Sequence, residues 1–318
     1  MAQLTDLELI SNGETTTVSK GFDKNTQRHV AVKALKSEFH NNELIAESFW
    51  REANFLLGDH HNFVHAYDVD RSSYQIIMDL MKGDLSTYTK NAPMAPEQVR
   101  QVLRQGLEGL NDLHEGGLLH GAVEPSNMLY NEQGRVKFCD TVGLRPDEAI
   151  PRPSGEGKYV APEAVNPKLG EFGPHTDLYC LGLSVLELAA GPQFDSFFPG
   201  VKADWKSDAA EAAWARWHGS AEYTLRPIRE LVPQLDSQTA RVLDKLLKKR
   251  LSDRYAQASE ALRDLDKRIE GTGLSGSTSG ETGAFGIGDL NSLFTQSGIR
   301  VPVMPIQQAE PEKKKSSP

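Results

Sequence analysis

The sequence is poor in cysteine and has no long apolar run. Its 318 residues include two cysteines, Cys139 and Cys180, which lie far apart and form no CxxC pair. This usage excludes a disulfide-stapled scaffold and is typical of reduced thiols in an intracellular protein. No segment approaches the roughly eighteen apolar residues of a membrane helix, and the N-terminus lacks the features of a signal peptide. We therefore expect no membrane span and a cytoplasmic location.

Basic side chains are also in deficit. The chain has 35 Lys and Arg against 44 Asp and Glu, a formal net charge of −9. Sequence-independent binding of nucleic acid needs a basic surface that neutralises phosphates, so we expect no nucleic-acid partner. Hydrophobic residues make up 38% of the chain. A chain of this length and composition can bury a large core, as one two-lobed domain or as two domains.

The first part of the chain combines short β-type runs with one helical stretch. The runs cover residues 15–19, 29–35 and 74–78, and the helix is expected over residues 42–57. In that helix the apolar residues recur near helical spacing: Leu44, Ile45, Phe49, Phe55 and Leu56. A turn is expected at residues 82–84.

The rest of the chain is mostly helical up to about residue 270. Residues 96–114 carry an apolar stripe on one face, and residues 177–190 are apolar nearly all round, which predicts a helix buried in the centre of a lobe. Two amphipathic stretches, 237–248 and 256–269, close the domain. The remaining residues, 273–318, are rich in Gly, Ser and Thr and then in Pro and Lys, so we expect a flexible, disordered tail. The alternative is that its few apolar residues, Leu290, Leu293 and Phe294, dock on a partner or on the domain itself.

Residues 120–127 read HGAVEPSN. They resemble the catalytic loop H-R-D-L-K-P-x-N of the eukaryotic-type protein kinases, in which the Asp accepts the substrate proton and the Asn holds Mg²⁺. Asn127 matches, whereas Ala122 stands at the Asp position and Glu124 at the Lys position. A methyl group accepts no proton. The resemblance therefore implies a kinase-like domain that has lost phosphoryl transfer, a pseudokinase.

Two further segments carry the resemblance. The run HVAVK ends at Lys33, and Glu52 follows 19 residues later on the helical stretch, which implies the ion pair of this family. Asp140 lies 13 residues after Asn127, at the Asp of the family's D-F-G motif, and together they imply a Mg²⁺ site. Thr141 replaces the Phe of that motif and fills less volume. The alternative is that Asp140 is a plain loop carboxylate.

The loop that covers the phosphates in this family is poorly matched. Only Gly13 of its three glycines is present, and the β-branched Thr16 restricts the approach of the backbone to a phosphate. Glu14 adds a negative charge, and as a plain hairpin the segment needs no ligand. With ATP and Mg²⁺ as the implied cofactor, the implied nucleotide-binding residues are Gly13, Val18, Ala31, Lys33, Glu52, Met78, Asp79, Met81, Asn127, Leu129 and Asp140. Ordinary core packing explains the apolar members equally well.

Other motifs concern the larger lobe. Glu163 ends the run YVAPE, which resembles A-P-E, and Arg254 stands where the family has the buried partner of that Glu. Asp177 matches the Asp of the central helix, so we expect a normally folded lobe. Glu156 replaces the Thr that bonds to the catalytic Asp and Lys. Gly121 replaces the Arg that binds a phosphorylated activation loop, so we expect no control by phosphorylation of that loop.

Two groups of residues suggest other sites. Three histidines lie close together, but they match a loop of the kinase pattern better than a metal site: His60, His61 and His65. Three tryptophans of an Ala-rich stretch indicate core packing or, alternatively, a partner surface: Trp205, Trp214 and Trp217.

The resemblance implies an α+β, two-lobed fold. A small antiparallel β lobe with one helix is expected over residues 1–81 and a larger, mainly α lobe over residues 82–272, followed by the tail. Three hypotheses for function stay open. The first is a pseudokinase that acts as a scaffold or allosteric partner of signalling proteins, such as an active kinase, and is switched by nucleotide. The second is a residual serine/threonine kinase with Glu124 or Glu156 as substitute base. The third is a fold that binds no nucleotide and only presents surfaces.

Overall fold

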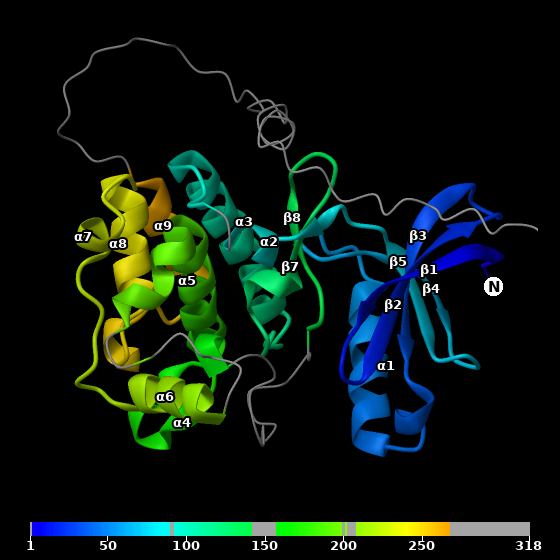
Figure 1. Ribbon diagram of the computed structural model, residues 1–318, viewed down its shortest axis with the longest axis horizontal. Helices are drawn as coiled ribbons and strands as arrows, with labels where there is room; N and C mark the ends of the chain where they lie inside the picture. Colours follow the sequence, from blue (N-terminus) through cyan, green and yellow to red (C-terminus); the bar gives the residue numbers. More distant parts are fainter. Residues whose placement is uncertain (1, 90–91, 142–156, 199–200, 202–207, 268–318) are drawn as a thin grey trace, which may run out of the picture.

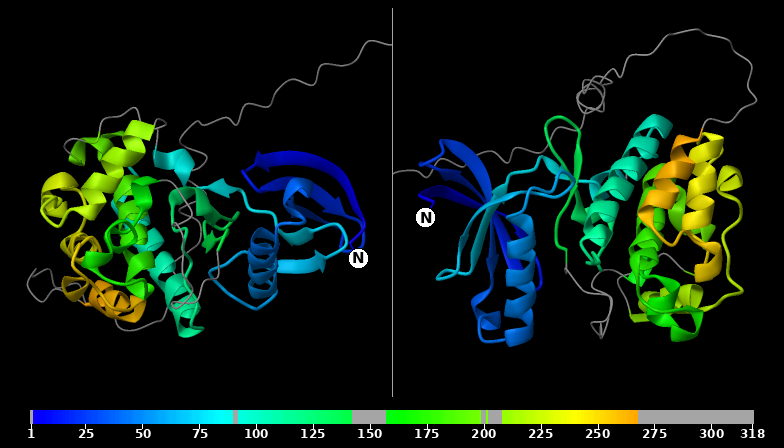
Figure 2. Two further views of the ribbon diagram at one scale, coloured as in Figure 1. Left: turned by 90° about the horizontal axis from the view of Figure 1, so that it is seen from below. Right: turned by 180° about the vertical axis from the view of Figure 1, so that it is seen from behind.

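The computed structural model describes residues 2–89, 92–141, 157–198, 201 and 208–267. A β-rich part and a helical part lie side by side, with a small sheet between them (Figures 1 and 2). This is the expected α+β fold with two lobes. Glu156, Trp205 and the tail 273–318 fall outside the described residues.

The β-rich lobe is a five-stranded antiparallel sheet with the order β1-β2-β3-β5-β4. Its strands are β1 (Leu4–Asn12), β2 (Thr16–Asp23), β3 (Arg28–Leu35), β4 (Ala66–Asp70) and β5 (Gln75–Asp79). The sequence pattern indicated β2, β3 and β5 but missed β1 and β4. Most of β1 is exposed on both faces, so it has no alternation of buried and exposed residues that a pattern could detect.

The one helix of this lobe is α1 (Glu43–Leu56), within the predicted range. It begins where the Asn42 side chain accepts a hydrogen bond from the backbone N–H of Ile45, a typical N-cap. Its buried face includes Phe49, Glu52 and Leu56. Leu44, in the first turn, shares the helical spacing of the apolar residues but is 80% exposed.

The small sheet has the order β6-β7-β8, with β6 (Gly83–Asp84), β7 (Met128–Tyr130) and β8 (Val136–Phe138). The prediction of a turn over residues 82–84 was therefore wrong in part, since Gly83 and Asp84 pair with Tyr130 and Leu129. Strands this short leave no period in the sequence. The hairpin of β7 and β8 places the residues on either side of it, the loop before β7 and the segment after β8, next to each other.

The helical lobe is built around α3 (Pro96–Glu115) and α5 (Pro174–Ala190). The predicted stripe on α3 is completely buried, and α5 is buried nearly all round, as expected. The two helices approach closely at Gly106, where a Cβ atom would lie 2.6 Å from Leu181 Cδ1. The other helices are α2 (Ser86–Thr89), α4 (Pro162–Val165), α6 (Asp208–Gly219), α7 (Ile228–Leu231), α8 (Ser237–Leu246) and α9 (Ala258–Asp266).

Within the described ranges, no helix has the length and apolar character needed to cross a bilayer. Trp214 and Trp217 are 3% and 4% exposed, so core packing is the correct interpretation for these two. The described residues also contain no group of three or more His, Cys, Asp or Glu side chains able to hold a metal ion. His60 stacks on Phe55, and the ring of His65 faces the carbonyl of Gly58.

Candidate functional site

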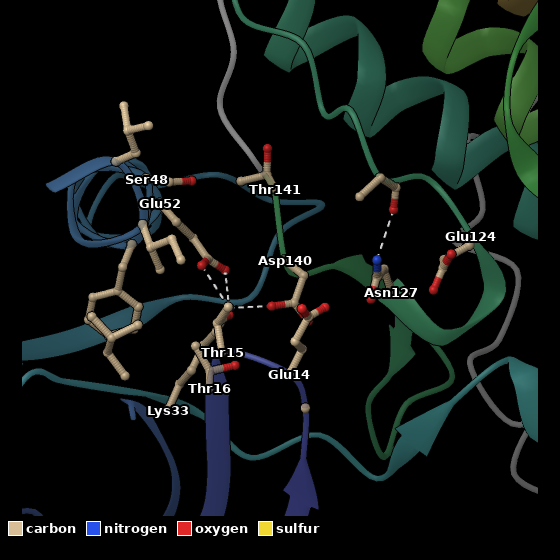
Figure 3. A pocket seen from close by; sticks show the side chains of 16 residues that line it. Glu14, Thr15, Thr16, Lys33, Ser48, Glu52, Glu124, Asn127, Asp140 and Thr141 are labelled. Carbon is tan, nitrogen blue, oxygen red and sulfur yellow. Dashed lines mark hydrogen bonds and ion pairs between the residues drawn. The ribbon is translucent and has the colours of Figure 1, made fainter. Parts of the chain in front are cut away.

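A cavity of about 580 Å³ opens between the two lobes (Figure 3). Its walls are the turn between β1 and β2, the end of β3, one side of α1, the loop before β7, and Asp140 and Thr141 after β8. The charged side chains of these walls are Glu14, Lys33, Glu52, Glu124 and Asp140. The fold thus collects residues from both lobes around one space.

Lys33 is the centre of the charged group. Its Nζ lies 2.7 Å from Oε2 and 2.9 Å from Oε1 of Glu52, and it also forms an ion pair with Oδ1 of Asp140. Lys33 and Glu52 are 5% and 6% exposed, whereas the Asp140 side chain is 48% exposed. The predicted ion pair between Lys33 and Glu52 is therefore confirmed. Asp140 also pairs with Lys33, so its carboxylate belongs to the charged group of the cavity.

The pKa values follow from this arrangement. Burial alone would lower the pKa of Lys33, but the charges of Asp140 and Glu52 overcome it and raise that pKa above its ordinary value. The ammonium group in turn lowers the pKa of Asp140. Burial raises the pKa of Glu52, and the nearby Lys33 offsets this only in part. Lys33 and Asp140 are accordingly both charged at neutral pH.

The backbone of Asp140 explains its position. Its φ is +55°, in the left-handed region, which Asp tolerates better than most residues. The preceding segment is fixed by two backbone hydrogen bonds, from Phe138 N to Asn62 O (2.8 Å) and from Cys139 N to Asn127 O (3.1 Å). The carboxylate is thereby directed at Lys33, although Thr141 is smaller than the aromatic residue expected of the family pattern. Thr141 is itself 2% exposed.

The loop before β7 is fixed by hydrogen bonds to α5 of the helical lobe. Asp177, near the start of α5, accepts hydrogen bonds from the backbone N–H groups of His120 (2.8 Å) and Gly121 (2.9 Å). Within the loop, Asn127 Nδ2 donates to the carbonyl of Ala122 at 2.9 Å. These bonds leave the methyl group of Ala122 in the cavity wall. The loop is thus held in place by these bonds with Ala122 at the position of the motif's Asp.

Glu124 lies in the same wall, and its Oε1 accepts a hydrogen bond from the Ser126 hydroxyl. The lobe behind this loop is braced by the predicted pair of Glu163 and Arg254. This pair is bidentate, at 2.9 and 3.2 Å, and both side chains are fully buried. The sequence therefore predicted the support of the site correctly.

The residues expected around an adenine ring do not line this cavity. Ala31 and Met78 are paired neighbours on β3 and β5 and are 4% and 5% exposed, while Val18 and Leu129 are partly buried against the same core. The walls of the cavity in Figure 3 do not include them, nor Met81. The structure joins Gly13, Lys33, Glu52, Asn127 and Asp140 in one cavity, whereas the apolar residues of the adenine set pack in or against the core.

Asp79 has a different environment from the one expected. Its carboxylate accepts hydrogen bonds from Lys137 Nζ (2.9 Å), the backbone N–H of His65 (3.2 Å) and the hydroxyl of Tyr67. Burial would raise its pKa, but these donors lower it. The Asp79 side chain therefore links the end of β5 to Tyr67 of β4 and Lys137 of β8. The positions of Tyr67 and Lys137 in the sequence did not indicate these hydrogen bonds.

The sequence also missed part of the cavity wall. Leu44, Ile45 and Ser48 of α1 line it together with Thr15. The helical spacing marked Leu44 and Ile45, but as packing residues rather than as a cavity wall. Ser48 and Thr15 carry no motif, so only the fold brings them to this place.

The donors suit a hard cation that is shared with a ligand. Asp140 offers a half-exposed carboxylate. The hydrogen bond of Asn127 to Ala122 uses the amide nitrogen Nδ2 and does not involve the amide oxygen, Oδ1. Mg²⁺ typically takes one or two protein ligands together with waters and substrate phosphates. Asn127 and Asp140 therefore fit Mg²⁺ only when phosphate oxygens complete its coordination.

Comparison with known proteins agrees with this geometry. Residues 4–264 match the family model of the protein kinase domain. The serine/threonine-protein kinase PknL of Mycobacterium tuberculosis is 29% identical over 271 residues, which cover 82% of this chain and 64% of the relative. A probable serine/threonine-protein kinase PknB of Lactococcus lactis is 26% identical over 263 residues, 76% of this chain and 39% of that protein. PrkC of Bacillus subtilis is 28% identical over 195 residues, 58% of this chain and 30% of that protein. The chain thus spans less than two thirds of the length of these relatives.

Proposed function

The chain belongs to the protein kinase family, and on that premise we propose that it is a pseudokinase, which binds an adenine nucleotide with Mg²⁺ without transferring its phosphate. In this proposal it acts on protein partners as a scaffold or allosteric regulator whose state depends on the nucleotide. A partner of this kind is an active kinase or another signalling protein.

One observation carries the proposal: the methyl group of Ala122 occupies the wall of the cavity where the kinase motif has its proton-accepting Asp. Positioned general bases contribute about 10²–10⁴-fold to rate. Glu124 stands where the motif has a Lys that neutralises the transferred phosphoryl group. Two unit charges about 4 Å apart at an effective dielectric near 20 interact by roughly 4 kcal/mol, so exchanging attraction for repulsion opposes the transfer strongly.

The groups that would hold the nucleotide are retained. Lys33 would present its ammonium group to the α- and β-phosphates, and its ion pair with Glu52 supports this position. Asn127 and Asp140 would hold Mg²⁺, which neutralises phosphate charge when bound. The apolar residues Ala31 and Leu129 would enclose the adenine.

A thermal-shift experiment tests nucleotide binding. The melting temperature of the full chain is measured with ATP or ADP, each with and without Mg²⁺, because a ligand that binds only the folded state stabilises it by mass action. We expect stabilisation by Mg²⁺-ATP and Mg²⁺-ADP, and its loss in the variant Asp140→Asn. Equal melting temperatures with and without every nucleotide would favour the third hypothesis, a fold that only presents surfaces.

A residual serine/threonine kinase is the second candidate, and one contact favours it. The Glu124 carboxylate in the cavity wall already accepts a hydrogen bond from a hydroxyl group, that of Ser126, so it has the chemistry of a substitute base. The variant Glu124→Gln keeps the shape and removes the basicity. Radiolabel transfer that falls to background in this variant would support the second candidate over the first.

A further inference from the structure

The cavity carries more negative than positive charge. Of the residues in its described walls, four are carboxylates and one is an ammonium group, a formal charge of −3. The single cation, Lys33, already pairs with both Glu52 and Asp140. A phosphate chain that enters this space without a cation therefore meets a net negative field.

Glu14 differs from the other three carboxylates. Glu52 and Asp140 bind Lys33, and Glu124 accepts a bond from Ser126. Glu14 has no hydrogen-bond or ion-pair partner among the residues that the structure describes, and it is exposed. Its side chain extends from the turn between β1 and β2 into the cavity (Figure 3).

The turn holds Glu14 in this place. The backbone N–H of Gly13 donates to the carbonyl of Thr16 at 2.9 Å, which closes the hairpin over the cavity. A Cβ atom added at Gly13 would have as its nearest neighbours the carbonyl oxygen and the hydroxyl oxygen of Thr16, at 3.4 and 3.9 Å, so this turn is not tightly packed. The turn thus sets the backbone position of Glu14 at the cavity, and its carboxylate has no partner among the described residues.

We propose that Glu14 makes this cleft select its ligand by charge, so that a nucleotide enters as its divalent-cation complex and a metal-free polyphosphate is rejected. The inference rests on the proposed nucleotide binding and specifies its ligand class. Without metal, affinity decreases as phosphates are added, in the order adenosine, ADP, ATP. With Mg²⁺, the cation offsets the phosphate charge and the contacts of Lys33 favour the phosphorylated ligands.

The expected size of the effect follows from one charge. A carboxylate about 6 Å from a phosphate charge, at an effective dielectric near 40, weakens binding about tenfold. Removing the charge in Glu14→Gln should therefore strengthen the binding of metal-free ATP about tenfold. Adenosine has no phosphate, so its affinity should not change.

The test is a set of equilibrium titrations of the full chain with adenosine, ADP and ATP, in EDTA and in Mg²⁺. The variants are Glu14→Gln and, as a matched control, Glu8→Gln, which removes the same charge from the exposed face of β1 outside the cavity walls. We expect only Glu14→Gln to raise the affinity for ATP in EDTA. Equal affinities of the wild type and Glu14→Gln for metal-free ATP would overturn the inference, as would an equal gain in Glu8→Gln.

The outcomes separate the two proposals. If no adenosine ligand binds under any condition, the proposed nucleotide binding fails. If adenosine and Mg²⁺-ATP bind but the wild type binds metal-free ATP as tightly as adenosine, nucleotide binding stands and the role of Glu14 is refuted. Thermal melting of both variants without ligand shows whether either substitution alters folding.

Discussion

Replacing Ala122 by Asp and Glu124 by Lys in one chain should create phosphoryl transfer. Ala122 already faces the cavity, and the loop around it is fixed by the bonds of Asp177 and Asn127 to backbone atoms, which neither substitution removes. The new carboxylate therefore enters an open space on an unchanged backbone. The new ammonium group replaces a like charge by an opposite one next to the phosphates.

The magnitude follows from these two changes. A positioned base contributes about 10²–10⁴-fold. The charge reversal at Glu124 acts through an interaction of roughly 4 kcal/mol at 4 Å and an effective dielectric near 20, and even a third of this after screening is worth about tenfold. We expect the double variant to transfer phosphate at least about 10³-fold faster than the wild type.

The assay is transfer of radiolabelled phosphate from Mg²⁺-ATP to the chain itself and to a generic protein acceptor. The matched control is Ala122→Asn with Glu124→Lys, which has the shape of the new side chain but no proton acceptor. If the double variant binds ATP and transfers no more than this control, Ala122 and Glu124 do not account for the loss of activity. The cause would then lie at Asp140 and Thr141.

Two further predictions concern stability. The variant Arg254→Leu leaves the Glu163 carboxylate buried without its partner, so the free energy of unfolding measured in urea should fall by about 3–5 kcal/mol. The control Arg104→Ala breaks an exposed ion pair with Asp266 and should lower this free energy by less than about 1 kcal/mol. Equal losses in the two variants would contradict the argument. Burial lowers the pKa of His120 to about 4, below the ordinary value near 6.5, so between these two pH values the unfolded state binds the extra proton. The free energy of unfolding should therefore be highest above about pH 6.5 and fall towards pH 4, and this fall should be smaller in the variant His120→Gln. Urea unfolding curves of both proteins at pH 7, 5.5 and 4 check this prediction. Identical pH dependence of the two proteins would refute it.

The sequence predicted the parts of the fold that repeat or keep a fixed spacing. The stripe on α3 and the apolar α5 were recognisable because burial of a long helix leaves a period. The pair of Lys33 and Glu52 was recognisable because both residues match the family's motifs at the expected spacing. By contrast, β6 is two residues long and β1 is mostly exposed, so neither leaves a pattern.

The site was predictable only in part, for a related reason. Motifs name side chains one at a time, whereas the ion pair of Asp140 with Lys33 depends on a left-handed backbone after β8. The unpaired state of Glu14 among the described residues likewise depends on how a hairpin closes over the cavity. The bonds of Asp79 to Tyr67 and Lys137 join three strands, and no local pattern contains that information.

Steady-state transfer of the γ-phosphate from Mg²⁺-ATP by the purified wild-type chain, compared with the variant Lys33→Ala, tests the central claim most directly. Because Ala122 accepts no proton and Glu124 repels phosphate, we predict the same background signal from both proteins. Sustained turnover by the wild type that disappears in Lys33→Ala would contradict the account.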